Sequence, residues 1–290
     1  MTEADSEELS LTFENVEGPI TLPVLADRVE EIVQENLVFR DAFRPYDATN
    51  ISSNVVQIPV PDDDGASPKI VDEGGEFPRS HEEYSLKELF FDKFGFEVPL
   101  TMEAVEDSRI NLTQDQVDRQ ARSMAEDINA RAFEAIQDGI GGDANMVQDE
   151  GGSTGTMTYN DVLAGREELV SQSYSPDLLI ADVGAVHDLM KSDNFLRATD
   201  IGDQLRRDGA IGRIAGMEVV EDDSGLDLTG GNSNPGALMV ATDLFGYEGE
   251  RTPVTTEEYS EDRSQTDVYR IFSRMGWLVT EENAGVIVEG

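Results

Sequence analysis

Residues 71–101 read VDEGGEFPRSHEEYSLKELFFDKFGFEVPLT, and NVVQIPV at 54–60 comes shortly before them. Apolar residues alternate with polar ones in both flanks, and such alternation is typical of β-strands. A polar segment with two adjacent glycines joins the flanks. The sequence therefore predicts a long two-stranded ribbon whose polar end carries little apolar material for the chain's own core to cover.

The returning strand of this ribbon changes phase. Tyr84 and Leu86 share one alternation, while Leu89 and Phe91 follow the opposite one, and a regular alternation resumes from Phe94 to Leu100. Successive side chains of a strand point to opposite faces, so a change of phase marks a bulge or a change in which face is covered. We expect one of these near residue 90.

The charge of the chain is its most extreme global property. Asp and Glu number 61 against 21 Lys and Arg, which gives a formal net charge of −40. Periodic apolar segments run through the whole sequence, which argues against disorder. Nucleic-acid binding depends on clustered Lys and Arg, so this composition disfavours it. Molar salt reduces the Debye length to roughly 3 Å, and the composition therefore indicates adaptation to high salt.

Several classes are disfavoured by what the sequence lacks. It contains no cysteine, so disulfides and thiolate metal sites do not hold the fold. No stretch approaches the roughly 20 apolar residues of a membrane span, and the acidic start MTEADSEELS has no signal-peptide pattern. We expect no membrane association, and an extracellular acidic surface protein is disfavoured for the same reason.

Helices and strands follow one another in a mixed order. Helical spacing predicts helices over 22–39, 113–138, 159–173 and 183–191, the second beginning in a T-x-x-Q capping box. Strands are expected at 177–181, 216–221, 236–242, 254–259, 267–277 and 284–288, with a turn-rich segment at 40–53 and a Gly-rich linker at 141–157. This order indicates an α+β protein.

A search for catalytic chemistry finds one weak motif. GGSTG places Ser153 in a G-x-S-x-G pattern, with Asp182 and His187 following in hydrolase order. A nucleophile elbow needs a buried strand before its serine, and NMVQDE is a poor strand. His81 and His187 are too few for a catalytic zinc, and adjacent carboxylates mean little among 61. We predict no enzyme, no cofactor and no dedicated metal site.

The order of the segments resembles the major capsid proteins of tailed viruses, which share the HK-ninety-seven fold. The resemblance covers nearly the whole chain: LVFRDAFRPY, VVQIPV, VDEGGEFP, FEVPLTMEAVEDS, TYNDVLAGREEL, IAGMEVVEDD, GALMVATD and WLVTEENAGVIVEG occur in the expected order. With the acidic composition, it resembles the capsid protein of a haloarchaeal virus. In this family the ribbon is called the E-loop and lies over a neighbouring subunit.

The resemblance implies a division into named parts. These are an N-terminal arm at 1–21, the start of the peripheral domain at 22–53, the E-loop ribbon at 54–100, the peripheral domain with its spine helix at 101–157, the axial domain at 158–250 and the C-terminal strands of the peripheral domain at 251–290.

The implied function is structural. Copies of the chain would form pentamers and hexamers that close an icosahedral head around double-stranded DNA, without sequence-specific contact. Assembly in the host cytoplasm and residence in the virion are expected, with a portal and separate scaffold or cement proteins as further partners. An encapsulin-like cargo compartment with the same fold is the alternative, and a halophilic hydrolase using Ser153 is a second one.

Charged residues of the ribbon and of other segments are candidates for contacts between subunits, because a guanidinium can hold a carboxylate with two bonds. The candidates are Asp62, Asp63, Asp64, Lys69, Glu73, Arg79, Arg109, Arg251 and Arg263. The family's type member has a cleaved N-terminal scaffolding segment and a Lys–Asn cross-link. We expect neither here, although Lys69 lies in the matching loop.

Overall fold

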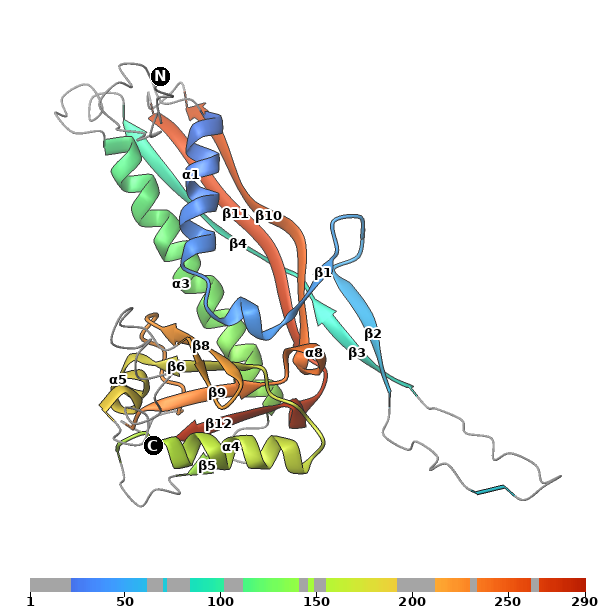
Figure 1. Cartoon of the computed structure of the whole chain (residues 1–290). Coiled ribbons are helices and arrows are strands. Elements are labelled where there is room, and N and C mark those ends of the chain that lie inside the picture. Colours follow the sequence, from blue (N-terminus) through green and yellow to red (C-terminus); the bar gives the residue numbers. More distant parts are fainter. Residues whose placement is uncertain are drawn as a thin grey trace, which may run out of the picture.

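The computed structural model describes residues 22–61, 70–71, 84–101, 112–140, 146–148, 155–191, 212–229, 234–261 and 266–290. The described elements form two packed units and a projecting ribbon (Figure 1). One unit is elongated and joins two helices to a four-stranded sheet. The other holds a six-stranded sheet with helices against it.

The four-stranded sheet has the order β1-β10-β11-β4. Its strands are β1 (Arg44–Asp47), β10 (Gly246–Glu261), β11 (Thr266–Val279) and β4 (Asp92–Thr101). β10 and β11 form a long antiparallel hairpin, β4 lies antiparallel to β11, and β1 lies parallel to the first residues of β10. The expected antiparallel strands near the C-terminus are thus present at 246–279.

Two helices cover one face of this sheet. α1 (Leu22–Glu35) and α3 (Leu112–Ile140) pack against each other, and α1 also packs against β10 while α3 packs against β11 (Figure 1). The apolar stripe expected along the long helix is buried, and its members are Val117, Ala121, Met124, Ile128, Ala132 and Ile136. Buried Asn129 of α3 holds the segment that follows α1: its Oδ1 accepts from Val38 N at 3.0 Å, and its Nδ2 donates to Asn36 O at 2.8 Å.

The six-stranded sheet has the order β5-β12-β9-β6-β8-β7. Its strands are β5 (Met146–Gln148), β12 (Gly285–Glu289), β9 (Gly236–Val240), β6 (Leu178–Asp182), β8 (Met217–Asp222) and β7 (Arg213–Ile214). The segment 141–157 therefore holds a short strand and is not only a linker. β12 pairs with β9 and β5, so the last strand belongs to this sheet and not to the four-stranded one.

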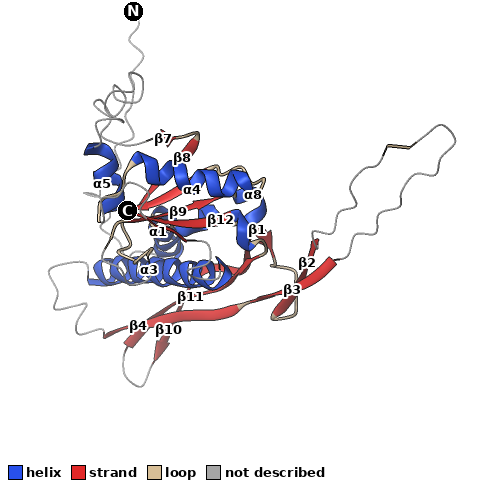
Figure 2. Ribbon diagram, turned by 90° about the horizontal axis from the view of Figure 1, so that it is seen from below, coloured by secondary structure: helices blue, strands red, loops and turns tan. Residues whose placement is uncertain are grey.

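Helices lie on both faces of the six-stranded sheet. α4 (Tyr159–Ser171) and α5 (Val183–Lys191) share a core with Leu179 and Met239, whereas the C-terminal half of α3 packs on the opposite face with Ile180 and Leu238. Figure 2 shows β9 and β12 lying between α4 and α3. Because the N-terminal half of α3 packs on the four-stranded sheet, one helix belongs to both cores.

A buried ion pair fastens the short helix η2 (Phe39–Ala42) to β10. Arg40 Nε lies 2.9 Å from Glu248 Oε1, and Trp277 Nε1 donates to Glu248 Oε2 at 3.3 Å. Glu248 is 2 % exposed, and burial raises the pKa of its carboxyl while Arg40 lowers it. Removing the guanidinium would leave a buried charge uncompensated.

The ribbon consists of β2 (Val55–Pro61) and β3 (Tyr84–Phe90), paired antiparallel. Phe91 separates β3 from β4, and the two strands belong to different sheets. The phase change between Leu86 and Leu89 does not mark a bulge or a change in the covered face, because β3 pairs regularly with β2 from Tyr84 to Phe90. The two phases lie on the two faces of the ribbon, Tyr84 and Leu86 on the exposed one and Leu89 on the buried one. The range 54–100 also needs correction, because residues 92–101 pair with β11 inside the body.

The end of β3 sits over two glycines that face each other across the β10–β11 hairpin. Gly249 and Gly276 are cross-strand partners. A Cβ on Gly249 would lie 2.5 Å from Phe91 Cε1 and 2.7 Å from Leu89 Cδ2, and a Cβ on Gly276 would overlap the carbonyl oxygen of Phe90. The two glycines leave the space that β3 occupies. We call this contact the glycine seat.

Replacing Gly276 by Ala tests the glycine seat. The added methyl group must displace the backbone of Phe90, and overpacking of this kind costs about 1–3 kcal/mol. We expect a loss of that size in the free energy of unfolding of unassembled subunits, measured by denaturant titration in molar salt. Hydrogen exchange of the backbone amides of Val55–Ile58 in β2 should accelerate.

Gly184→Ala is the matched control, because a Cβ there meets no atom closer than 3.2 Å. Equal effects of the two substitutions would show that the glycine seat does not hold the ribbon.

Candidate assembly surface

Most of the charged residues proposed for contacts lie outside the described part of the chain. These are Asp62, Asp63, Asp64, Lys69, Glu73, Arg79, Arg109 and Arg263, and His81 and Ser153 lie outside it as well. Arg251 is described. It stands on β10 at a break in the register of the hairpin, close to the start of the ribbon.

Arg251 holds the segment that leads into the ribbon. Its Nη1 donates to Ser53 O at 3.1 Å and to Asn54 Oδ1 at 2.6 Å, and its Nη2 donates to Ser52 O at 3.1 Å. On the other strand, Phe91 N donates to Asn54 O at 2.9 Å. Within its own chain, Arg251 therefore positions the base of the ribbon.

One face of the ribbon turns toward the body. Val56 lies opposite Leu89, and Ile58 lies opposite Lys87. Ile58 and Leu89 are buried in a small cluster with Ala48 and Phe91, against which Tyr46, Tyr247 and Leu278 also pack. This face, together with the glycine seat, accounts for the direction in which the ribbon leaves the body.

The opposite face of the ribbon is exposed and largely apolar. Its cross-strand pairs are Val55 with Phe90, Pro59 with Leu86 and Pro61 with Tyr84, and a hydrogen-bonded Gln57–Glu88 pair lies among them. Phe90, Leu86 and Tyr84 are 57 %, 59 % and 57 % exposed. We call this surface the outer ribbon face.

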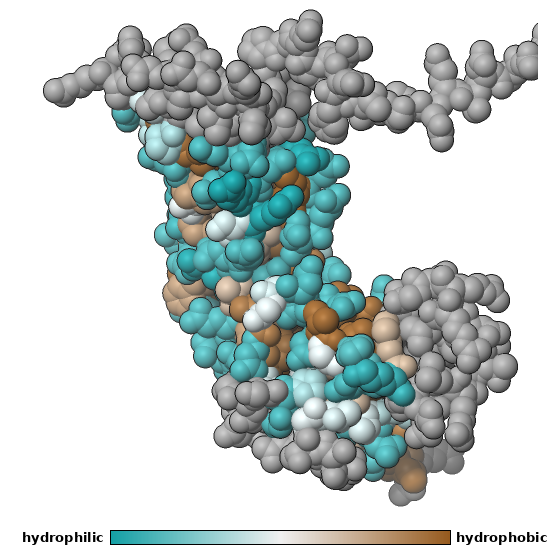
Figure 3. Space-filling model, turned by 90° about the vertical axis from the view of Figure 1, so that its left-hand side faces the viewer, coloured by the Kyte–Doolittle hydropathy of each residue, from teal (hydrophilic) through white to brown (hydrophobic). Residues whose placement is uncertain are grey.

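The outer ribbon face contrasts with the rest of the molecule. Of eight exposed large hydrophobic residues in the described chain, Ile70, Tyr84, Leu86 and Phe90 belong to the ribbon segment. Hydrophilic residues cover most of the described surface seen in Figure 3, and hydrophobic ones show in small separate patches. A concentrated apolar surface on an otherwise polar molecule marks an interaction site.

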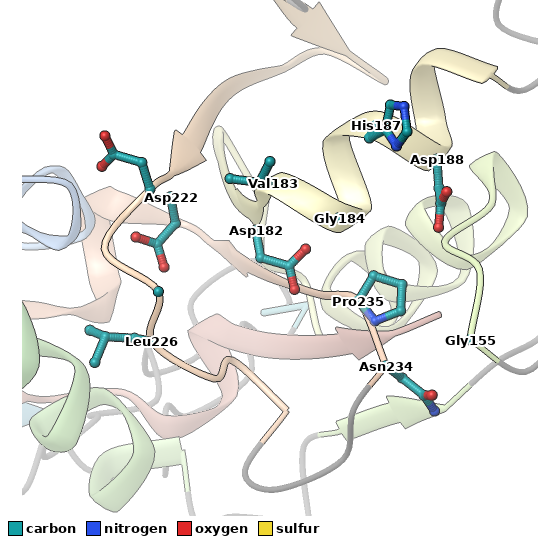
Figure 4. Close-up of a pocket in the computed structure, with 12 residues that line it drawn as sticks. Gly155, Asp182, Val183, Gly184, His187, Asp188, Asp222, Leu226, Asn234 and Pro235 are labelled. Carbon is teal, nitrogen blue, oxygen red and sulfur yellow. The ribbon is translucent and has the colours of Figure 1, made fainter.

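A pocket of about 440 Å³ at the end of the six-stranded sheet is the alternative site. Four carboxylates, those of Asp182, Asp188, Asp222 and Asp223, line it together with His187 (Figure 4). No group of three His, Cys, Asp or Glu residues in the described ranges is arranged to hold a metal ion.

The arrangement of the pocket does not match a hydrolase triad. Both oxygens of Asp182 accept from backbone amides, Oδ1 from Ala185 at 2.6 Å and Oδ2 from Gly236 at 2.7 Å. Figure 4 shows this carboxylate directed toward Pro235, while His187 lies farther along α5. Asp182 therefore caps α5 and fixes β9, which are structural roles.

Asp222 is the pocket's unusual residue. It is 2 % exposed; its Oδ1 accepts from Ser224 N at 2.9 Å and Ser224 Oγ at 2.5 Å, whereas its buried Oδ2 has no hydrogen-bond partner among the described residues. Burial raises the pKa of this carboxyl, and the nearby charges of Asp223 and Asp182 raise it further.

The raised pKa of Asp222 predicts a pH dependence of stability. A carboxyl with a higher pKa in the folded chain stabilises the fold fully below its unfolded pKa of 3.8, and this stabilisation is lost as the pH rises through the folded pKa. Asp222→Asn removes the titrating group. We therefore expect the variant to lose less stability than the wild type as the pH rises from about 4 to 7, measured by denaturant titration of unassembled subunits.

Asp223→Asn serves as the control, because Asp223 is exposed and lines the same pocket. Its substitution changes the charge of the chain by the same amount. If the Asp222→Asn and wild-type curves ran parallel across this pH range, the proposed effect of burial on Asp222 would be wrong.

None of the described helices has the length and apolar character needed to cross a bilayer.

Comparison with known proteins identifies the family. A family model described as phage capsid protein matches residues 87–288. No curated protein sequence matches the chain. The matched segment covers more than half of the chain, from the second half of β3 to β12. It includes the six-stranded sheet and three strands of the four-stranded sheet, β4, β10 and β11.

Solved structures share the fold at low sequence identity. A chain from Mycobacterium phage Che8 is 16 % identical with a TM-score of 0.66, covering 87 % of this chain and 90 % of that one. A chain from the capsid of cyanophage P-SCSP1u is 12 % identical with a TM-score of 0.69, covering 87 % of this chain and 88 % of that one. A chain from the mature capsid of bacteriophage PhiM1 is 12 % identical with a TM-score of 0.63, covering 87 % of this chain and 86 % of that one. The expected α+β capsid fold is thereby confirmed.

Proposed function

This chain belongs to the phage capsid protein family, and from that premise we propose that it is the major capsid protein of a tailed virus, assembling with itself into pentamers and hexamers. These close an icosahedral head around double-stranded DNA. The role is structural and non-enzymatic, and the site of action is the virion, assembled in the host cytoplasm with a portal and separate scaffold or cement proteins.

The outer ribbon face is the observation that carries this proposal. Its three large side chains are more than half exposed in the single chain, and covering each of them would contribute roughly 1 kcal/mol at about 25 cal/mol per Å². A ribbon has only two faces, and the other one is turned to its own body. The outer ribbon face is therefore suited to being buried against a second copy, as the E-loop of this family lies over a neighbouring subunit.

The two units correspond to the two domains of such a subunit. The elongated unit, with α1, α3 and the four-stranded sheet, is the peripheral domain, and α3 is its spine helix. The unit of the six-stranded sheet is the axial domain, whose loops would meet around the fivefold and sixfold axes. Residues 1–21 would form an arm that reaches a neighbour.

The charge of −40 supports adaptation to high salt and a haloarchaeal host. Copies with this charge repel one another in dilute salt, whereas molar salt screens carboxylates beyond roughly 3 Å. DNA inside such a shell would meet an acidic wall. Confinement by the closed shell, without sequence-specific contact, fits this composition better than a basic lining.

The charge leads to a prediction about salt. Particles dialysed from molar salt into dilute, divalent-free buffer should dissociate, because unscreened carboxylates then repel across every contact between copies. Light scattering and negative-stain microscopy measure the change, and restoring the salt concentration tests its reversal. Particles that stay intact in dilute buffer would contradict the electrostatic account.

The outer ribbon face leads to a prediction about assembly. Leu86→Asp places a charge on an exposed position, so the free energy of unfolding of the subunit should change by less than about 0.5 kcal/mol. Assembly should be lost or require at least tenfold more protein, as size-exclusion chromatography and microscopy in molar salt would show.

Leu86→Met keeps the position apolar and should assemble normally, and Val183→Asp adds the same charge at an exposed residue of α5. Normal particles from Leu86→Asp would remove the outer ribbon face from the assembly contacts.

A further inference from the structure

Three cations gather where the ribbon joins the body. Lys93 on β4 and Arg274 on β11 are cross-strand partners, and Arg251 on β10 is next to Thr252, the other partner of Arg274. Both guanidinium groups converge on one atom, Asn54 Oδ1, at 2.6 Å from Arg251 Nη1 and 2.9 Å from Arg274 Nη2. We call these three residues the root cluster.

The root cluster binds no carboxylate within the described chain. The acceptors of Arg251 are two backbone carbonyls and the Asn54 amide oxygen, and the described hydrogen bond of Arg274 goes to the same amide oxygen. Arg274 Nε is buried without a partner in the described part. Lys93 Nζ lies over the Phe272 ring, 4.4 Å from its centroid.

The other described cations are mostly paired with acids. Within 4.0 Å of a carboxylate lie Arg28, Arg40, Arg44, Arg119, Arg131, Lys191 and Arg270. Among the described residues, Lys87, Arg122, Arg166 and Arg213 also lack such a partner, but they stand on four different elements, β3, α3, α4 and β7. Within the described part of a strongly acidic protein, the root cluster is therefore a local concentration of positive charge without an ion-pair partner.

We infer that the root cluster is a receptor for carboxylates of a neighbouring copy of this chain. The inference rests on the proposed function, which brings copies into contact at the ribbon. Like charges that converge on a neutral amide repel one another, and an anion between them removes that repulsion. A guanidinium presents donors in a fork that matches a carboxylate, and Arg274 Nη1 and Arg251 Nε make no hydrogen bond within the described part.

Charge balance identifies the anion as a protein carboxylate. Each copy carries 61 acidic residues against 21 basic ones, so a neighbouring copy offers far more carboxylates than cations. A nucleic acid would have to approach a molecule of net charge −40 to reach three cations, which disfavours phosphate. The root cluster meets at Asn54, the residue before Val55, which pairs with Phe90 on the outer ribbon face. A neighbour that covers the base of the ribbon can therefore reach the cations as well.

Carbodiimide cross-linking tests the inference directly, because it joins a lysine amine to a carboxylate in contact with it. Particles would be assembled in molar salt from a mixture of unlabelled and ¹⁵N-labelled chains, cross-linked, and analysed by peptide mass spectrometry. The chain has four lysines, Lys69, Lys87, Lys93 and Lys191, so assignment is direct. We expect Lys93–Asp or Lys93–Glu links that join one light and one heavy peptide.

Lys191 is an internal control, because its Nζ lies 3.5 Å from Asp188 Oδ1 of its own chain and should give same-isotope links. Lys93 links within single chains alone, or none in assembled particles, would overturn the inference. Protection of Lys93 in DNA-filled particles but not in empty shells would assign the cluster to phosphate and overturn it as well.

A second measurement uses variants in the full chain. Lys93→Gln should raise the critical concentration for assembly about tenfold and leave the thermal midpoint of the subunit unchanged, while Lys93→Arg should restore assembly. Arg213→Gln is the matched control, because Arg213 on β7 is a cation with no carboxylate partner among the residues that the structure describes. If the wild type forms particles and Lys93→Gln assembles at the same critical concentration, the inference is wrong but the proposed function stands. If the wild-type chain forms no particles at all, both the proposed function and this inference are wrong.

Discussion

Strand β3 crosses the β10–β11 hairpin above Gly249 and Gly276, and the architecture of the ribbon depends on this crossing. A side chain on either glycine would occupy the space of Leu89, Phe90 or Phe91. The crossing ends one sheet and begins another, because β3 pairs with β2 and β4 pairs with β11. It thereby fixes which face of the ribbon is buried and which is left for another molecule.

Helix α3 gives this crossing a rigid support. Its first half packs with β11 and α1, and its second half packs with the six-stranded sheet. The buried pair of Arg40 and Glu248 adds a polar tie between η2 and β10. The ribbon, the elongated unit and the unit of the six-stranded sheet are thus joined through α3 and the β10–β11 hairpin.

The sequence predicted the elements whose signal is local. The stripe along α3 and the strands β2 and β3 depend on neighbouring residues, and the structure confirms them. The phase change between Leu86 and Leu89 was misread as a bulge or a change in the covered face, because both faces of the ribbon carry apolar residues. β1 and β5 were missed, because four and three residues carry too little periodicity, and their pairing with β10 and β12 comes from the tertiary fold. The sheet that β12 joins and the pairing of β4 with β11 likewise depend on contacts between residues far apart in the sequence.

The candidate surface was predictable only in outline. Alternation indicated an exposed ribbon, but not that Tyr84, Leu86 and Phe90 share its outer face, which follows from the register. Arg251 was singled out for its residue type, whereas Lys93 and Arg274 were missed because only the β4–β11 pairing brings them together. The facing glycines gave no signal either, since their role depends on a strand more than 150 residues away.

In the proposed assembly, another copy of the chain completes the ribbon. An electron cryomicroscopy reconstruction of particles purified in molar salt would show this contact. We expect a closed shell in which Tyr84, Leu86 and Phe90 of each copy are covered by an adjacent copy. Particles in which these side chains face solvent, or in which the ribbon lies back on its own body, would contradict it.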